Sequence, residues 1–501
     1  MTTVSTEQFL LQLQASDVQV WLDGERVRVS VPKDVVIPGL REELAARKAD
    51  IVAFLSSLPR DAVTADEPPL AARADASPVP LSFGQQRVWM LHELNKDLRS
   101  PYDTLTLNVR LRGALDIVAL RRSLDAIVGR HEVLRTTFHM DDAEPVQIVA
   151  AVAEAAFDTV DLRDRSADES AALTEQLLRA AKETLFDLAH GPVLRAWLIR
   201  LGEAEHILAI ALHHIVFDAW SMGILTRELG LLYRGFAAGR PAELPALPLQ
   251  YGDFALWQRR WMQGSVLTRH LDYWEKQLAG LELLELPLDR PRPALQSYAG
   301  DTATLRIDAA VSAALTDVAK ANSATPFMVL LAALGMLLAR YSGQTDVAIG
   351  TPITNRDRPE LQGLIGYFLN TLVMRLDLSG DPAFATLLPR VRRVVLDGFA
   401  HQHLPFELLV ERLKLERDPS RSPLFQVLFV MQNAAESASL QLGELDGVPI
   451  AVAGATTRFD LEFYLYHDAA GFSANCVYNT DLFEAETVQR MLGHYANLLA
   501  A

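Results

Sequence analysis

The stretch His213-His214-Ile215-Val216-Phe217-Asp218-Ala219 joins an apolar run, residues 207–212, to an amphipathic segment that begins near Ser221. The run is typical of a buried strand and the segment is typical of a helix. Loops between a strand and the next helix often carry reactive side chains in α/β proteins. Because side chains alternate along a strand, His213 and His214 should point to opposite sides, and only one can face a given cleft. A pair of satisfied core histidines remains the alternative for these seven residues alone.

The composition narrows the class of protein. With 501 residues the chain is too long for one core, so we expect two or three domains. The net charge of −16 argues against a nucleic-acid partner. The single cysteine, Cys476, excludes an internal disulfide and fits a reducing cytoplasm, and we expect it to be buried and inert. Residues 1–7 lack a secretory signal, and the longest apolar stretch, 327–339, is too short to span a bilayer. No motif indicates a metal site, so we expect no metal. Because the longest apolar stretch is too short for a span, we also expect no membrane partner.

The chain divides into four parts by pattern. Residues 1–58 predict a small α/β unit, with helices at 5–14 and 40–58 around a β-hairpin at Asp23-Gly24. Residues 59–79, rich in Ala, Asp and Pro, predict a linker that leaves this unit tethered. Residues 80–256 and 257–501 each mix strands with helices, which predicts two α/β (α+β) lobes with a cleft between them.

Six further motifs accompany the histidines. They are SFGQQRVW at 82–89, RHEVLRTTF at 130–138, YGDFALWQ at 251–258, IGYFLNT at 365–371, HQHLPFE at 401–407 and RDPSRSPL at 417–424. In this order and spacing the seven motifs resemble the condensation domains of nonribosomal peptide synthetases, over about residues 80–501. The helix–hairpin–helix pattern of residues 1–58 is similar to the docking domains of the tubulysin assembly line.

The resemblance implies two lobes like chloramphenicol acetyltransferase, arranged as a V, with a tunnel between them at the histidine motif. An upstream donor carrier protein, bound through its C-terminal docking tail, would bring an acyl or peptidyl thioester. A downstream acceptor carrier, loaded by its adenylation domain, would bring an aminoacyl thioester. No cofactor is expected on the chain itself, because both 4'-phosphopantetheine arms belong to the carriers. The end of the chain, residues 482–501, resembles the family's last helix before the next domain, so we expect a piece of a larger synthetase.

The resemblance also implies roles for the motif residues. His214 would face the tunnel and hold or deprotonate the attacking amine, while His213 and Asp218 would brace the loop. A buried carboxylate needs a cationic partner. Arg130 is the expected partner of Asp218, with Arg135 second, and the alternative is a surface Arg130 that caps its own helix.

Other motif residues have less specific roles. Trp220 and Ser221 follow the histidines and would line the tunnel region, whereas core or interface packing is expected for Trp257 and Asn370. Ala219 replaces the usual glycine of the family, and its methyl group could narrow the acceptor side or alter the loop. In the docking unit, Arg26, Arg28 and Lys33 form a basic edge for an acidic or apolar tail, or are merely solvated charges.

Three functional readings stay open. The motifs SFGQQRVW at 82–89 and RHEVLRTTF at 130–138 resemble the subtype that joins an L-configured donor to an L-configured acceptor, although a polyketide module could also supply the donor. A catalytically impaired platform that recruits tailoring enzymes or carriers is the alternative, for which Ala219 leaves room. A free-standing acyltransferase that uses coenzyme A thioesters is disfavoured by the docking unit.

Overall fold

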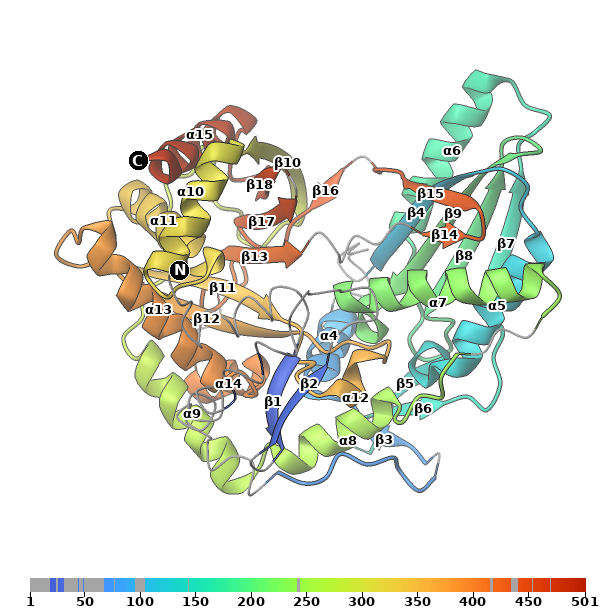
Figure 1. Cartoon of the computed structure of the whole chain (residues 1–501), viewed down its shortest axis with the longest axis horizontal. Coiled ribbons are helices and arrows are strands. Elements are labelled where there is room, and N and C mark those ends of the chain that lie inside the picture. The colour runs from blue at the N-terminus through green and yellow to red at the C-terminus, as the bar shows by residue number, and fades with distance from the viewer. Residues whose placement is uncertain are drawn as a thin grey trace.

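Two lobes stand side by side as a V and join at their bases in the computed structural model of the chain (Figure 1). The structure describes residues 67–501 apart from Ala76, 95–103, Ala143, 241–243, 415–417, 434–439, Ala453 and Ala469, and before them β1 (Gln19–Asp23), β2 (Arg26–Ser30), Leu44 and Lys48. β1 and β2 pair antiparallel with Asp23 opposite Arg26, which confirms the predicted hairpin. The helices predicted at 5–14 and 40–58, Lys33, and the side chains of Arg26 and Arg28 lie outside the described residues.

A six-stranded sheet, in the order β14-β15-β4-β9-β8-β7, forms the first lobe. Its strands from the first half of the chain are β4 (Thr104–Arg112), β7 (Ala156–Asp161), β8 (Leu194–Arg200) and β9 (Glu205–His213). Leu208 and Ile210 of β9 join the main core with α5 (Ile117–Arg130) and α7 (Ala219–Ala237). Ile207 and Ala209 instead pack with α6 (Ala167–Lys182). Alternation along β9 therefore buries both of its faces, which confirms the predicted buried strand.

Two strands of this sheet come from the far half of the chain. β15 (Leu445–Pro449) pairs antiparallel with β4, and β14 (Gln441–Leu442) lies outside it. The expected lobe boundary between residues 256 and 257 also falls inside helix α8 (Tyr251–Trp261). The division into 80–256 and 257–501 therefore needs correction. The segment that returns to pair with the edge strand β4 comes from residues 441–449, and its local sequence does not indicate this pairing.

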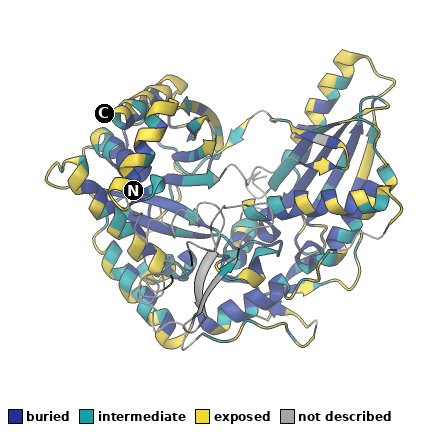
Figure 2. Cartoon of the chain, viewed as in Figure 1, coloured by how far each residue is buried: buried dark blue, intermediate teal, exposed yellow. Residues whose placement is uncertain are grey.

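The second lobe is built on a seven-stranded sheet in the order β12-β11-β13-β17-β18-β10-β16. Its strands are β10 (Ala299–Arg306), β11 (Asp346–Ile353), β12 (Asn370–Asp377), β13 (Val427–Asn433), β16 (Ala455–Thr456), β17 (Leu461–Asp468) and β18 (Gly471–Asn479). Its helices are α10 (Ala309–Ala321), α11 (Pro326–Ser342), α13 (Phe384–Ala400) and α15 (Ala485–Ala500). The central strands of the two sheets, such as β9 and β11, are largely buried, whereas strands β7 and β10 are mostly exposed or half-buried (Figure 2). Cys476 of β18 lies fully inside, and burial raises the pKa of its thiol, as expected for an inert cysteine.

Short elements fill the base where the lobes meet. They are β3 (Val79–Pro80), α4 (Phe83–Leu94), the 3-10 turn η3 (Glu132–Arg135), β5 (Thr136–Asp141), β6 (Glu144–Val149), α9 (Gly264–Leu278), α12 (Pro359–Gln362) and α14 (Phe406–Leu413). α4 contacts both α14 of the second lobe and the turn that carries His214, so the start of the body binds the two lobes together.

Among the described residues no single helix is long and apolar enough to cross a bilayer. Helices α10 and α11 taken together have the length and composition of a membrane span, but they are bent by 105° relative to each other.

Candidate active site

The histidine turn, residues 213–221, joins β9 to α7. His213 ends the strand, His214–Val216 form the 3-10 turn η4, and α7 begins at Ala219. Asp218 occupies the N-cap of α7, where its Oδ1 accepts a hydrogen bond of 2.8 Å from the Ser221 backbone N–H. Aspartate is favoured at this position because it satisfies a backbone donor that the helix leaves open. The local sequence alone therefore explains where the turn stops and the helix starts.

His214 is held in one protonation state. Its Nδ1 lies 2.7 Å from the carbonyl oxygen of Phe217. A carbonyl can only accept, so Nδ1 carries the proton and Nε2 keeps its lone pair. Burial, followed by the charge of Arg458, lowers the pKa of His214 to about 4, so the ring is neutral near pH 7. The residue keeps 4% of its surface exposed and meets the ring of Tyr367 edge-on at 5.0 Å.

His213 has different surroundings. Its Nδ1 accepts a hydrogen bond of 3.0 Å from the backbone N–H of Ile215, so this lone pair is already engaged. The rings of His92 and Phe186 meet it edge-on at 5.1 and 5.7 Å. Burial lowers the pKa of His213 well below its ordinary value. The two histidines thus sit in separate environments, as alternation along the strand predicted, and only His214 carries its acceptor nitrogen away from the backbone.

Asp218 pairs with an arginine that the sequence interpretation missed. Arg356 Nη2 lies 3.1 and 3.2 Å from the two carboxylate oxygens, and both side chains are completely buried. Asp218 also accepts from Ser221 Oγ at 2.7 Å and from the Phe368 backbone N–H at 3.1 Å. Because Asp218 belongs to the first lobe and Arg356 to the second, this network ties the histidine turn across the lobes.

Further contacts hold Arg356 in place. Its Nη1 donates to the carbonyl oxygens of Leu361 and Leu364 at 2.9 and 2.6 Å, and its guanidinium lies 3.9 Å from the ring centre of Phe368. Arg356 comes three residues after the buried strand β11, in the same kind of strand-end position as the histidines. That position was the available signal, although none of the seven motifs includes Arg356.

Arg130 and Arg135, the expected partners of Asp218, lie elsewhere, so that pairing was wrong. Arg130 Nε lies 3.2 Å from Glu228 Oε1 of α7, and its Nη2 donates to the carbonyl of Pro245 at 2.7 Å. Arg135 lies 3.8 Å from Glu132. Arg130 therefore fastens α5 to α7, whereas Arg135 pairs within η3 just beyond the end of α5.

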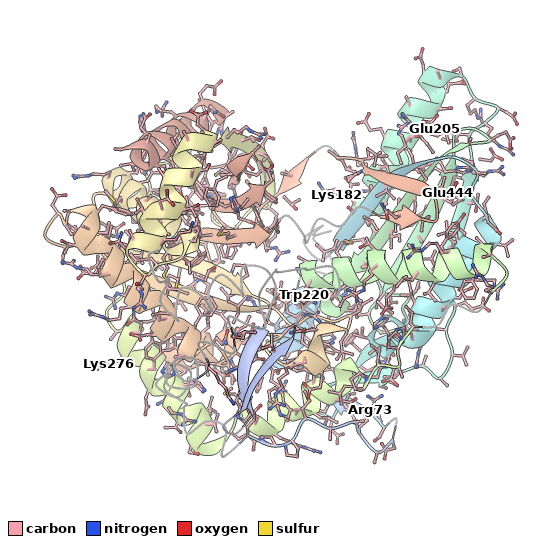
Figure 3. The ribbon with its side chains drawn as sticks, viewed as in Figure 1. Arg73, Lys182, Glu205, Trp220, Lys276 and Glu444 are labelled. Carbon is pink, nitrogen blue, oxygen red and sulfur yellow. The ribbon has the colours of Figure 1, made fainter. Side chains whose placement is uncertain are left out.

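The remaining motif residues are placed as follows. Trp220 lies where α7 reaches the second lobe, and its Nε1 donates to the Gln362 carbonyl at 3.0 Å (Figure 3). Asn370 donates to the carbonyls of Gln402 and Leu404, both at 2.7 Å, so it holds the turn before α14. Trp257 donates to the carbonyl of Pro68 at 2.8 Å and thereby contacts the segment that leads into the body.

Ala219 is the exposed first residue of α7 and has helical backbone geometry. Alanine is the best helix former, so the replacement of glycine introduces no local strain in this turn. Its effect on the acceptor side stays a prediction.

Two family models match the chain. The condensation-domain model covers residues 76–501, and the model of the TubC N-terminal docking domain covers residues 6–57. Two linear gramicidin synthase proteins of Brevibacillus parabrevis are similar to this chain, one 47% identical over 84% of it and the other 42% identical over 95%. The chain spans only 6% and 9% of the length of these two relatives.

Solved structures share the fold. The X-domain in its complex with OxyB from teicoplanin biosynthesis has a TM-score of 0.79 and 31% identity, with 86% of this chain and 95% of that chain covered. The first condensation domain of the calcium-dependent antibiotic synthetase has a TM-score of 0.68 at 21% identity and covers 85% of this chain and 97% of that one. The second likeness supports the fold alone, and with it the V of two acetyltransferase-like lobes.

Proposed function

The chain belongs to the condensation-domain family of nonribosomal peptide synthetases and carries a TubC-type docking domain, and from this membership we propose that it forms an amide bond between two carrier-bound thioesters. The amine of the acceptor aminoacyl group attacks the carbonyl carbon of the donor thioester. The carbon–sulfur bond then breaks, the donor thiol leaves, and the acyl or peptidyl chain stays on the acceptor. The opening motifs favour an L-configured donor and an L-configured acceptor.

The protonation state of His214 supports this chemistry. With Nδ1–H bound to the Phe217 carbonyl, Nε2 can accept a hydrogen bond or a proton from the attacking amine. The low pKa keeps this nitrogen unprotonated near pH 7. His213 cannot act in the same way, since its Nδ1 lone pair is bound to the Ile215 N–H. His213 and Asp218 are therefore proposed as positioning residues and His214 as the catalytic residue.

Magnitudes favour positioning as the larger contribution. A well-placed general base accelerates a reaction by roughly 10²–10⁴-fold. Two reactants held in the right geometry gain effective molarities of about 10⁵–10⁸ M. We propose that the two phosphopantetheine arms reach His214 from opposite sides through a passage between the lobes, and that their alignment supplies most of the rate.

Transfer between defined carriers tests the proposal. The donor carrier is loaded with an acyl group and the acceptor carrier with an amino acid, and mass spectrometry detects the amide on the acceptor. We expect product with the wild-type chain and a loss of at least about 100-fold for His214→Ala, by the contribution of a general base. A His214→Ala protein as fast as wild type would exclude any role of this ring.

The docking domain is proposed to recruit the upstream donor protein through its tail. Deletion of residues 1–58 should abolish transfer from the tail-bearing donor at low concentration but spare a donor that is fused directly to the body. Equal transfer from the tail-bearing donor after deletion would contradict recruitment.

A platform for tailoring enzymes is the second candidate, supported by the likeness to the X-domain that is seen in complex with OxyB. The intact histidine turn favours catalysis. The assay separates the two, because a platform yields no amide.

A further inference from the structure

The segment of residues 67–80 is attached to the body along its length. We call it the strap, because it contacts both lobes on its way to α4. Leu70 packs partly buried against the main core, and Val79 and Pro80 pair with β6 as strand β3. Its composition had predicted a free linker over 59–79, so the described part departs from that expectation.

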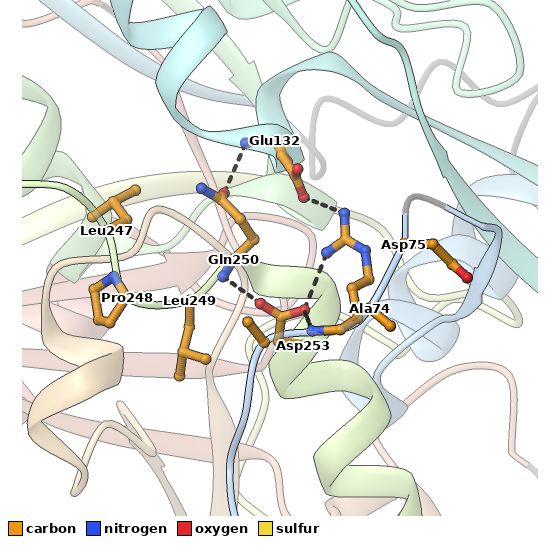
Figure 4. A pocket seen from close by; sticks show the side chains of 10 residues that line it. Ala74, Asp75, Glu132, Leu247, Pro248, Leu249, Gln250 and Asp253 are labelled. Atoms are coloured by element: carbon orange, nitrogen blue, oxygen red, sulfur yellow. Dashed lines mark hydrogen bonds and ion pairs between the residues drawn. The ribbon is translucent and has the colours of Figure 1, made fainter.

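Arg73 is the central anchor of the strap. Its guanidinium bridges two carboxylates, Glu132 of η3 and Asp253 of α8, with Nη1 at 3.2 Å from Asp253 Oδ1. Its backbone N–H also donates to Asp253 Oδ1 at 3.0 Å. Figure 4 shows both carboxylates turned toward this bridge in an open hollow of about 320 Å³, which is lined by residues 72–75 of the strap, Glu132, Asp253 and residues 247–250. The arginine side chain is only 11% exposed, so its ion pairs are shielded from solvent.

Two contacts anchor the strap at its other end. The Pro68 carbonyl accepts from Trp257 Nε1 at 2.8 Å. Glu67 forms an ion pair with Arg358, whose guanidinium lies 5.2 Å from the ring centre of Trp257. Arg358 follows β11 of the second lobe and Glu132 follows α5 of the first, so the strap is fastened at the base where the lobes join.

This attachment changes the length of the tether. The match to the docking-domain family ends at residue 57, so residues 58–66 alone lie between it and Glu67, whereas residues 58–80 would lie between it and Leu81 if the strap were free. Nine residues reach at most about 30 Å and 23 residues about 80 Å. We propose that the strap pins the docking domain near the base of the lobes and thereby raises the effective concentration of a docked donor carrier. The inference rests on the proposed recruitment of an upstream carrier by this domain.

The expected gain follows from tether length. Effective concentration falls roughly as the −3/2 power of linker length for a flexible tether. For a tether that follows this law, shortening 23 residues to nine raises the effective concentration about fourfold. Two independent changes should each remove this gain. One is the double variant Glu67→Gln/Arg73→Gln, which removes both ion-pair anchors of the strap, and the other is a 14-residue Gly-Ser insertion before Glu67, which lengthens the tether while the strap stays bound.

Single-turnover transfer tests the pinning. With a tail-bearing donor at saturating concentration, we expect both variants to react about fourfold more slowly than wild type. With a tail-less donor supplied at high concentration, all three should react alike. Arg163→Gln is the matched control, since Arg163 also bridges two carboxylates, Asp161 and Glu203, neither of which belongs to the strap or is one of its partners. Equal rates with the tail-bearing donor in all variants would overturn the proposal, and so would an equal slowing with both donors.

A distance measurement gives a readout that needs no activity. Spin labels at Lys48→Cys in the docking domain and Arg260→Cys on α8 report their separation by electron resonance, while the buried Cys476 is not labelled. We expect the distribution to broaden and lengthen in both variants, and an unchanged distribution would refute the pinning. Absence of amide product from wild type with either donor would instead contradict the proposed function and leave this distance test decisive for the strap.

Discussion

The histidine turn and the strap are each held by one arginine that faces carboxylate, but in opposite environments. At the turn, Arg356 and Asp218 are both fully buried and their pair crosses the lobes. At the strap, Arg73 is 11% exposed and pairs both with Asp253, which is 3% exposed, and with Glu132, which is 22% exposed and lies nearer the surface. Burial makes the first pair costly to break, because either partner alone would leave a desolvated charge. The Arg73–Glu132 pair is more exposed than the Asp218–Arg356 pair, so breaking it should cost less.

Breaking the buried pair should have the largest effect. Asp218→Ala leaves Arg356 buried without its counter-charge and removes the N-cap of α7, so we expect the free energy of unfolding to fall by about 3–5 kcal/mol. Urea denaturation measures this loss. For Asp218→Asn, which keeps the N-cap, the free energy of unfolding should fall less. A loss below about 1 kcal/mol for Asp218→Ala would show that the turn does not depend on the pair.

The strap pair should be worth less. A double-mutant cycle of Arg73→Gln and Glu132→Gln should give a coupling energy of about 1 kcal/mol, the upper range for surface pairs, that weakens in 1 M salt. Arg163 and Glu203 offer the matched exposed pair, for which coupling near zero is expected, because Glu203 is 84% exposed. A coupling energy at the strap as large as the loss at Asp218 would break the contrast between the two sites.

Acidification should change the protonation of the turn least. Because the pKa of His214 is lowered to about 4, its ring should stay neutral as the pH falls from 8 to 5.5, while an ordinary exposed histidine titrates near 6.5. NMR of histidine-labelled protein, with His214→Ala to assign the signal, checks this. The unfolded chain binds the proton first, so stability should decline as the pH falls from about 6.5 toward 4. A His214 signal that titrates near 6.5 would contradict the enclosed, neutral ring.

Individual contacts show how far the sequence could be read. The end of β9, the cap at Asp218 and the burial of Cys476 follow from patterns within a few residues, and the structure confirms them. The partner of Asp218 could not be found in this way, since Arg356 is 138 residues away. A motif at the end of α5 looked like the natural source of the arginine, but the side of the helix on which it lies carries it to Glu228 instead.

The strap is a second feature that the local sequence could not predict. A segment rich in Ala, Asp and Pro indicates a linker, and nothing beside Arg73 in the sequence indicates an anchor. Its partners Glu132 and Asp253 are 59 and 180 residues away, and only the packing of η3 against α8 brings them to one place.

The sequence by itself determined the family, the strand and helix on either side of the histidine turn, and the docking hairpin, because these depend on periodicity, caps and motif spacing. Tertiary structure alone decided which arginine neutralises Asp218, which lobe receives β15, and where the strap is fastened. Those outcomes depend on contacts between segments that are far apart along the chain. A buried charge or an edge strand pairs with whichever complementary group the tertiary fold places next to it.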